Sequence, residues 1–180
     1  MSEHRLRLKV ECVTGDITRQ TDLDAVVNAA NAALAPGGGV AGAIHAAAGS
    51  ALYRECAPLA PIAPGDAVIT GAGQLPNRHV IHTLGPVYGS DHPEAELLAA
   101  CYRNALIRAE EAGLASVGFP AISTGVFGYP MQEAARVAFS ELRRRAPSLK
   151  RVRLVRFVLF READRELHER IRIELGLGSA

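Results

Sequence analysis

The sequence predicts an α/β fold, in which helices cover both faces of a central sheet. The apolar residues are mostly Ala, Val, Leu and Ile, with no Trp, 5 Phe and 4 Tyr among 180 residues. Short apolar runs alternate along the chain with longer segments whose apolar residues recur at helical spacing. No repeat, low-complexity tract or long linker divides the chain, so we expect a single domain over residues 1–180.

Six short segments are predicted to be strands. Residues 6–11 alternate apolar and charged side chains, which is typical of an edge or half-buried strand. A turn rich in Gly, Pro and Asn separates 67–70 from 79–83. The remaining predicted strands are 24–28, 116–119 and 151–160.

Four segments are predicted to be helices. The first, 38–49, carries Ile44, Ala48 and the following Leu52 at helical spacing. The second is 94–112, ended by Gly113, and the others are 130–145 and 163–175. Because strands alternate with helices, ligands are expected at the carboxyl ends of the strands.

Composition excludes several classes of protein. No segment approaches the ~20 apolar residues that cross a bilayer, and the amino terminus lacks a signal-peptide apolar region. Cys12, Cys56 and Cys101 are far apart and lack zinc spacing, so we expect buried thiols, no metal and no disulfide framework. These features predict a cytoplasmic protein without a membrane partner.

Charge is unevenly distributed. The net charge is +1, yet residues 141–161 hold eight basic residues and one acidic residue, which leaves −6 for the rest of the chain. Such a segment can attract nucleic acid or another polyanion. Alternatively, it forms a solvated helix end and a strand whose charged residues, such as Arg151 and Arg153, face outward.

Two strand-to-helix junctions are rich in glycine. The first runs through 37–42 and the second through 120–130, and each leads into a predicted helix. Glycine lets backbone N–H groups approach a ligand closely, and a helix amino terminus favours anions. If both loops follow parallel strands they face the same edge of the sheet, which indicates one site for a diphosphate-bearing ligand.

Two better-known phosphate sites fit poorly. Residues 37–42 match G-x-G-x-x-G, but about eight residues separate them from the strand ending near Asn28, whereas a dinucleotide-binding turn follows its strand directly. Glu55 and Asp66 are badly placed to bind a ribose of such a dinucleotide. Neither loop has the Gly-Lys-Ser/Thr ending of a P-loop, so an ATPase mechanism is not expected.

Several ungapped motifs together resemble the macro domain family, and most closely its MacroD-type branch. The resemblance runs in order over residues 10–160. It implies a three-layer α/β/α sandwich around a central mixed sheet that binds ADP-ribose without a cofactor. The motifs are 15–18 (Gly-Asp-Ile-Thr), 28–31 (Asn-Ala-Ala-Asn), 37–45, 80–86 and 122–130.

The resemblance also implies roles for particular residues. Asp16 would accept a hydrogen bond from the adenine amino group beside Ile17, or it is simply a turn residue. Phe160 would pack on the adenine ring, or else belong to the core. Asn31 would contact the distal ribose, because its amide offers both donors and an acceptor.

The two loops would hold the diphosphate and the distal ribose. Phe127 would border that ribose, and His45, one turn after Ala41, would point toward the same site or be a helix-face residue without a chemical role. His82 in its strand is interpreted as a structural histidine. The loop residues implied as ligand contacts are Gly38, Gly39, Val40, Ser123, Thr124, Gly125, Val126 and Phe127.

One departure from the branch bears on catalysis. MacroD-type proteins remove ADP-ribosyl groups from acidic side chains and deacetylate O-acetyl-ADP-ribose, and their first loop carries an aspartate where this chain has Ala41. Other macro domains with alanine there hydrolyse such esters with a water held by the substrate's own phosphate. We therefore expect an ester hydrolase in which Asn31 and His45 take part, with no metal and no covalent nucleophile.

Two alternatives remain open at this point. One is a module that binds ADP-ribose, or an ADP-ribosylated protein, without turnover. The other is a binder of poly-ADP-ribose or nucleic acid through residues 141–161, whose binding would depend steeply on salt.

Overall fold

A six-stranded mixed sheet forms the centre of the computed structural model, which describes residues 8–178. The strand order is β1-β6-β5-β2-β4-β3, and all neighbours run parallel except β3, which is antiparallel to β4. The strands are β1 (Lys9–Thr14), β2 (Ala25–Ala29), β3 (Ala67–Gly71), β4 (His79–Thr83), β5 (Ser116–Phe119) and β6 (Leu154–Leu159).

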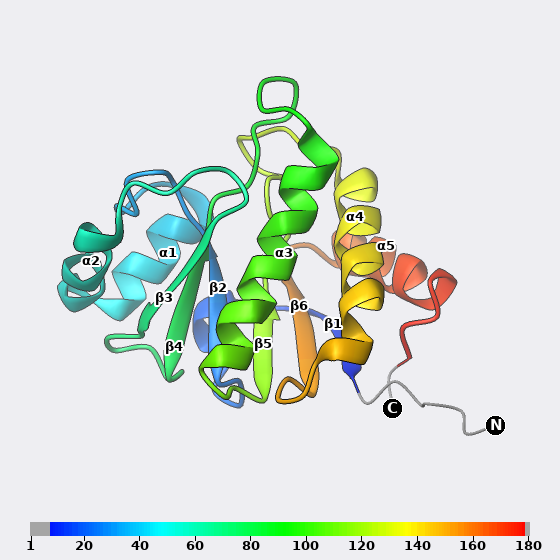
Figure 1. The fold of residues 1–180 in the computed structure, drawn as a ribbon, viewed down its shortest axis with the longest axis horizontal. Helices are drawn as coiled ribbons and strands as arrows, with labels where there is room; N and C mark the ends of the chain where they lie inside the picture. Colours follow the sequence, from blue (N-terminus) through cyan, green and yellow to red (C-terminus); the bar gives the residue numbers. More distant parts are fainter. Residues whose placement is uncertain (1–7, 179–180) are drawn as a thin grey trace.

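Helices cover both faces of this sheet. In Figure 1, α3 and α4 lie in front of the strands, while α1 and α2 lie toward the β3 end of the sheet. α5 contacts α4 and the edge strand β1. The helices are α1 (Gly39–Ala48), α2 (Ser50–Cys56), α3 (Glu94–Glu111), α4 (Met131–Arg145) and α5 (Glu162–Glu174).

The period-two geometry of the strands divides the interior into two cores. Val27 and Ile81 face the core under α3, α4 and α5, whereas their neighbours Val26 and Val80 face the core under α1 and α2. Strands buried on both faces explain why the strand segments of the sequence are nearly continuous apolar runs. The three-layer α/β/α sandwich predicted from the sequence is confirmed.

An aromatic cluster fills the larger core. The ring of Phe157 in β6 lies 4.7 Å from Phe139, 5.9 Å from Phe119 and 6.0 Å from Tyr102, measured between centroids. All four side chains are buried. Because they come from α3, α4, β5 and β6, the cluster joins two helices to the middle of the sheet.

Two expected elements, one helix and one strand, have wrong boundaries for identifiable reasons. The helix predicted over 38–49 with Leu52 on its face is two helices, because Gly49 has φ +85° and its N–H bonds to the carbonyl of His45, which ends α1. The strand predicted over 151–160 begins only at Leu154, because the N–H groups of 150–152 donate to the carboxylate of Glu110 instead of a strand.

The first strand also differs from its predicted bounds. β1 begins at Lys9 and continues to Thr14, three residues beyond the predicted end, in register with β6. Leu6 lies outside the described residues. The predicted place of this strand at the sheet edge is confirmed, since β1 is the first strand in the order. Of the three thiols expected to be buried, Cys56 and Cys101 are, whereas Cys12 in β1 is half-buried.

We predict that the aromatic cluster contributes strongly to stability. Phe157→Ala removes a fully buried ring and leaves a cavity, which typically costs about 3–5 kcal/mol. Urea denaturation should report this loss. Phe160→Ala, three residues along, should change the free energy of unfolding by less than about 0.5 kcal/mol because Phe160 is 90% exposed. Equal losses in the two variants would contradict this account of the core.

Candidate functional site

The carboxyl ends of β1, β6, β5, β2 and β4 share one edge of the sheet. This follows from their parallel pairing, and Figure 1 shows the connecting loops gathered along the upper edge of the view. Both glycine-rich loops follow strands of this group, the first after β2 and the second after β5. Since β2 and β5 are neighbours, the sheet brings the two loops together.

Asp16 and Phe160 lie beside each other at one end of this edge. They follow the paired strands β1 and β6, and the N–H of Gly15 donates to the carbonyl of Leu159 at 3.0 Å. Hydrogen bonds from Thr18 hold the pKa of Asp16 below its usual range, so the carboxylate is ionised. The 90% exposure of Phe160 excludes a core position. An exposed ring beside an anionic acceptor suits a flat group that carries an amine.

Asn31 shapes the first loop through its own side chain. Its Nδ2 donates to the carbonyl of Ala35 at 2.9 Å, and its Oδ1 accepts from the N–H of Ala35 at 3.0 Å. Each amide atom retains a further hydrogen-bonding position. The turn that these bonds close holds Leu34 at φ +53° with its side chain fully buried.

The first loop then folds tightly over the start of α1. A Cβ built on Gly42 would lie 2.3 Å from the carbonyl oxygen of Gly37, so only glycine fits there. A Cβ built on Gly37 would lie 3.2 Å from Nδ2 of Asn31 and 4.0 Å from Cβ of Ala41. Asn31 and the first turn of α1 therefore converge on Gly37.

The amino terminus of α1 is open to an incoming anion. Gly38 is its N-cap residue, no side chain caps it, and the residues of 36–39 are exposed. The N–H groups of the first turn have no partner within the helix. Together with the positive end of the helix dipole, they form an anion-binding position.

The second loop is a strained turn with exposed glycines. Ser123 is buried at φ +68°, a left-handed conformation that costs energy in a residue other than glycine. The N–H of Tyr129 donates to the carbonyl of Ser123 at 2.9 Å, and that of Gly128 to Gly125 at 3.0 Å. Val126 at the tip is fully exposed, while Phe127 packs against the same core as Val40 of the first loop.

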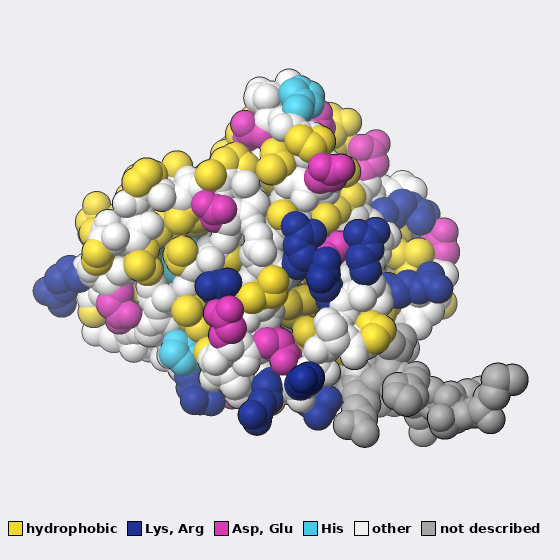
Figure 2. Space-filling view, in the orientation of Figure 1, with side chains coloured by type: hydrophobic (Ala, Val, Ile, Leu, Met, Phe, Trp, Pro, Cys, Tyr) yellow, Lys and Arg dark blue, Asp and Glu magenta, His cyan; other side chains and the backbone are white. Residues whose placement is uncertain are grey.

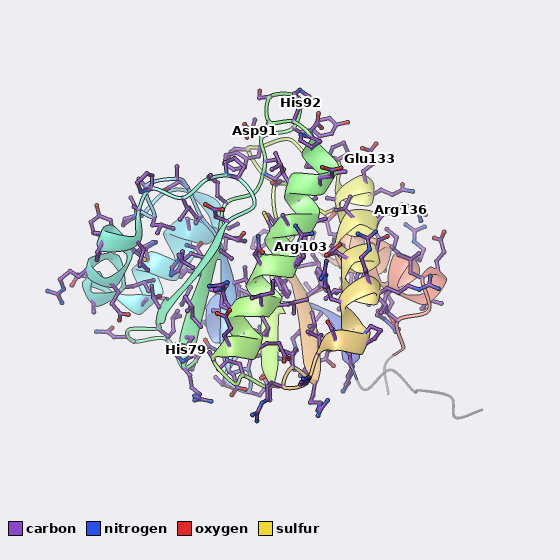
Figure 3. All side chains as sticks on the ribbon, in the orientation of Figure 1. His79, Asp91, His92, Arg103, Glu133 and Arg136 are labelled. Carbon is purple, nitrogen blue, oxygen red and sulfur yellow. The ribbon has the colours of Figure 1, made fainter. Side chains whose placement is uncertain are left out.

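A third loop, residues 84–93 between β4 and α3, supports the second. A Cβ on Gly85 would lie 2.1 Å from Oγ of Ser123, and the N–H of Tyr88 donates to the carbonyl of Phe127 at 2.8 Å. Its tip carries Asp91 and His92, labelled in Figure 3. Gly85 was not among the site residues predicted from the sequence. Gly85 lies within the 80–86 motif. Its close approach to Ser123 could not be predicted, because the two residues are 38 positions apart in the sequence.

His45 lies on the buried face of α1, away from solvent. It is 6% exposed, and its ring lies 6.3 Å from Tyr53 and 6.4 Å from His82. Neither ring nitrogen has a hydrogen-bond partner among residues 8–178. Burial lowers its pKa, so the ring is neutral. The structure therefore turns the His45 side chain from α1 toward the sheet and His82.

His82 forms a buried polar cluster in the same core. Its Nδ1 lies 3.1 Å from Nδ2 of Asn28 and its Nε2 lies 2.9 Å from Oγ1 of Thr70. With Nδ2 of Asn28 as the donor, Nδ1 accepts and Nε2 carries the proton. Burial, with a smaller contribution from His45, lowers the pKa of His82 to about 4. His82 is thus a structural, neutral histidine, as interpreted from the sequence.

Other possible binding features lie elsewhere or are not found in the described part of the chain. A cavity of about 160 Å³ between α4 and α5 includes no residue of the glycine-rich loops. Within residues 8–178, no three His, Cys, Asp or Glu side chains are grouped to hold a metal ion. Within the same range, no helix has both the length and the apolar character needed to cross a membrane.

Comparison with known proteins identifies the family. The Macro domain family matches residues 27–138, which include both glycine-rich loops. The O-acetyl-ADP-ribose deacetylase of Salmonella typhimurium is 53% identical over 135 residues, covering 72% of this chain and 75% of the relative. The chain therefore belongs to the macro domain family.

Solved structures agree with this assignment. The Oceanobacillus iheyensis macrodomain with ADP has a TM-score of 0.87 and 42% identity, covering 92% of this chain and 90% of its own. The Trypanosoma brucei macrodomain in complex with ADP-ribose has a TM-score of 0.83 and 40% identity, covering 89% and 68%. This chain is thus similar in sequence and fold to proteins solved with adenine nucleotides.

The close approach of Gly42 to Gly37 predicts an intolerant position. Gly42→Ala would force the first loop away from α1, and overpacking of this kind costs roughly 1–3 kcal/mol. Urea denaturation measures the loss. Gly125→Ala is the matched control, because a Cβ there meets nothing within 4 Å. A Gly42→Ala protein as stable as the control variant would show that the loop is not tightly packed.

The depressed pKa of His82 predicts acid sensitivity. In the unfolded chain its imidazole protonates near pH 6.5, whereas in the folded protein it does so only near pH 4. The unfolded state therefore binds the proton first as pH falls. The free energy of unfolding therefore has its full value from this group above about pH 7. It falls by roughly 3 kcal/mol as the pH approaches 4.

Denaturation curves at pH 7.5 and pH 4.5 test this. We expect His82→Gln to lose less stability on acidification than the wild type, and the exposed His92→Gln to behave like the wild type. The account is contradicted if His82→Gln loses as much stability as the wild type between the two pH values.

Proposed function

We propose that this protein binds ADP-ribose along the carboxyl edge of its sheet and hydrolyses esters of ADP-ribose. Its substrates would be O-acetyl-ADP-ribose and mono-ADP-ribosyl esters of acidic side chains in proteins. The products would be ADP-ribose and a carboxylic acid, since water is consumed as the ester bond breaks. The observation that carries this proposal is the convergence of two glycine-rich loops beside an uncapped helix amino terminus.

The relatives support the choice of ligand. Two similar folds were solved with ADP and with ADP-ribose, and a relative 53% identical is named an O-acetyl-ADP-ribose deacetylase. The geometry of this chain agrees with an elongated dinucleotide-like ligand. The adenine would lie between Asp16 and Phe160, next to β1 and β6, with Ile17 donating its backbone N–H.

The diphosphate would lie between the two loops. Backbone N–H groups would bind its oxygens without a cationic side chain, because helix and loop dipoles supply the positive potential. The contacts we propose on one side are Gly38, Gly39 and Val40. On the other side they are Ser123, Thr124, Gly125 and Val126.

The distal ribose would lie between Asn31 and Phe127. The free hydrogen-bonding positions of the Asn31 amide suit a sugar diol, because a diol both donates and accepts. The bonds from Asn31 to Ala35 fix the amide before the ligand arrives. Such preorganisation reduces the entropic cost of binding.

Catalysis would depend on positioning rather than on a strong base. Ala41 cannot accept a proton, so the diphosphate of the substrate would orient the attacking water. The loop N–H groups would stabilise the charge that develops in the transition state. Because the His45 side chain is buried between α1 and the sheet, we propose that it acts indirectly, by anchoring the helix that follows the first loop.

A second candidate function rests on Ala41 itself. A positioned base contributes about 10²–10⁴-fold to rate, so its absence favours slow turnover or none. The protein would then recognise ADP-ribosylated proteins without releasing them. Both functions require the same ligand site, and only turnover separates them.

Calorimetry with free ADP-ribose tests the shared site. We expect micromolar affinity for the wild type and a loss of at least about tenfold for Asn31→Ala, because hydrogen bonds to the distal ribose are removed. Gln132→Ala, which removes an exposed amide on α4, should bind as the wild type does. No heat of binding at micromolar concentrations would refute the ligand assignment.

Release of ADP-ribose from a glutamate-modified substrate tests turnover. We expect slow release by the wild type, much less by Asn31→Ala, and a kcat at least about tenfold higher for Ala41→Asp, which restores a base. Thermal melts must show that each variant folds. Tight binding without release by the wild type would favour the reader function, and undiminished release by Asn31→Ala would refute the role given to that residue.

A further inference from the structure

Basic side chains are also gathered at the opposite edge of the sheet, where the parallel strands begin. Arg78 directly precedes β4, and Arg153 directly precedes β6. The N–H of Arg153 donates to the carbonyl of Ala115, and the N–H of Arg78 donates to that of Asp24, each at 2.8 Å. These bonds place both arginines on one edge, across the starts of β6, β5, β2 and β4.

This edge is exposed. Figure 2 shows Lys and Arg side chains along the lower margin of the view, and Figure 3 labels His79, which begins β4 there. Arg78, Arg153 and the neighbouring Lys150 and Arg151 are all exposed. The site proposed for ADP-ribose lies at the other ends of the same strands. The two surfaces are therefore separated by the length of the sheet.

These cations form no ion pair within 4.0 Å in the described chain, unlike many of the other arginines there. Arg156, for example, binds both Glu11 and Asp22, whereas Arg78, Lys150, Arg151 and Arg153 have no carboxylate within 4.0 Å among residues 8–178. Within segment 141–161, Arg144 and Arg145 also form ion pairs, and they share the one carboxylate of Glu141 with Arg103. Arg54, Arg143, Arg161 and Arg170 also lack an ion pair in the described chain, but Arg78, Lys150, Arg151 and Arg153 share one edge of the sheet.

Three acidic groups near this edge bind backbone N–H groups or Arg108 and form no ion pair with these four cations. The carboxylate of Asp24 accepts the N–H of Ala115 at 2.7 Å, and Glu111 binds Arg108 at 3.3 Å. Glu110 accepts N–H bonds from residues 150, 151 and 152 at 2.8–3.2 Å. Glu110 therefore fixes the loop before β6, with the side chains of Lys150 and Arg151 exposed to solvent.

The chemistry of the edge indicates its partner. Binding of single-stranded nucleic acid usually adds aromatic side chains on which bases stack. The exposed aromatic residues of the described chain are Tyr53 on α2, Tyr88 in the 84–93 loop and Phe160 after β6, and none lies at this edge. Positive charge without stacking partners suits the phosphates of a duplex, whose bases are hidden.

The spacing agrees with a duplex backbone. From Arg153 to Arg78 the edge crosses three strand spacings of about 4.8 Å, or about 14 Å in all. One strand of a duplex presents a phosphate every ~3.4 Å along the axis, so about four phosphates fall within this distance. We propose that the basic edge formed by Arg78, Lys150, Arg151 and Arg153 binds the phosphate backbone of duplex nucleic acid without reading its sequence, independently of the ADP-ribose site.

Salt-dependent binding to a 20-base-pair DNA duplex tests this proposal by fluorescence anisotropy. Four phosphate contacts predict that log K falls with log salt with a slope of about −3.6. The double variant Arg151→Glu/Arg153→Glu should weaken binding at least about tenfold and make the slope shallower by about 2. The control is Arg54→Glu/Arg170→Glu, which changes the charge equally at exposed residues of α2 and α5.

We expect the control variant to bind the duplex nearly as the wild type does, and excess ADP-ribose not to displace the duplex. Equal weakening in both double variants would mean that only net charge matters and would overturn the proposal. Displacement by ADP-ribose, or tighter binding of a single strand of equal length, would also overturn it. Calorimetry of each variant with ADP-ribose distinguishes a failure here from a failure of the proposed function.

Discussion

Parallel pairing of β6, β5, β2 and β4 is the constraint on which the rest of the structure depends. It sends every carboxyl end of these strands to one edge and every amino end to the other. The loops after β2 and β5, which carry the exposed glycines, must therefore meet. The same pairing buries both faces of the sheet, so the chain needs helices on each side, and its buried Phe and Tyr rings lie in the core under α3, α4 and α5.

A buried polar cluster lies in the other core. Asn28 in β2 and His82 in β4 face the core under α1, where His45 also lies. Unpaired polar atoms in such a place are costly, and Oδ1 of Asn28 and both nitrogens of His45 have no partner within residues 8–178. The cluster sits directly beneath the helix whose amino terminus opens the first loop. Any change that charges or repacks it should therefore be transmitted to the loop.

The sequence predicted most of the fold because its signals are local. Strand alternation, helical spacing and glycine-rich junctions follow from neighbouring residues, and they located every strand and the larger helices. The late start of β6 could not be predicted, because the N–H groups of 150–152 donate to the carboxylate of Glu110. That residue lies about 40 positions earlier in the sequence. The break between α1 and α2 at Gly49 could not be predicted from the spacing. Leu52 in α2 is buried like Ile44 and Ala48 in α1, so the apolar residues recur every four positions across the break.

The same distinction holds for the candidate site. Glycine loops and their order were visible in the sequence, and the family resemblance that rested on them and on three further motifs is confirmed. The left-handed backbone conformation of Ser123 and its contact with Gly85 were not visible in the sequence. A close approach between two loops leaves no periodic pattern of residues. Nor could spacing show that Asn31 closes its own turn, or that His45 is buried against His82.

The central claim is that backbone amides of both loops bind a single diphosphate. An NMR titration of the ¹⁵N-labelled protein with ADP-ribose tests it most directly, since each amide reports its own contacts. The account predicts that the amide signals of Gly38, Gly39, Gly125 and Val126 shift together, with one shared dissociation constant. Shifts confined to one loop, or different constants for the two loops, would contradict it.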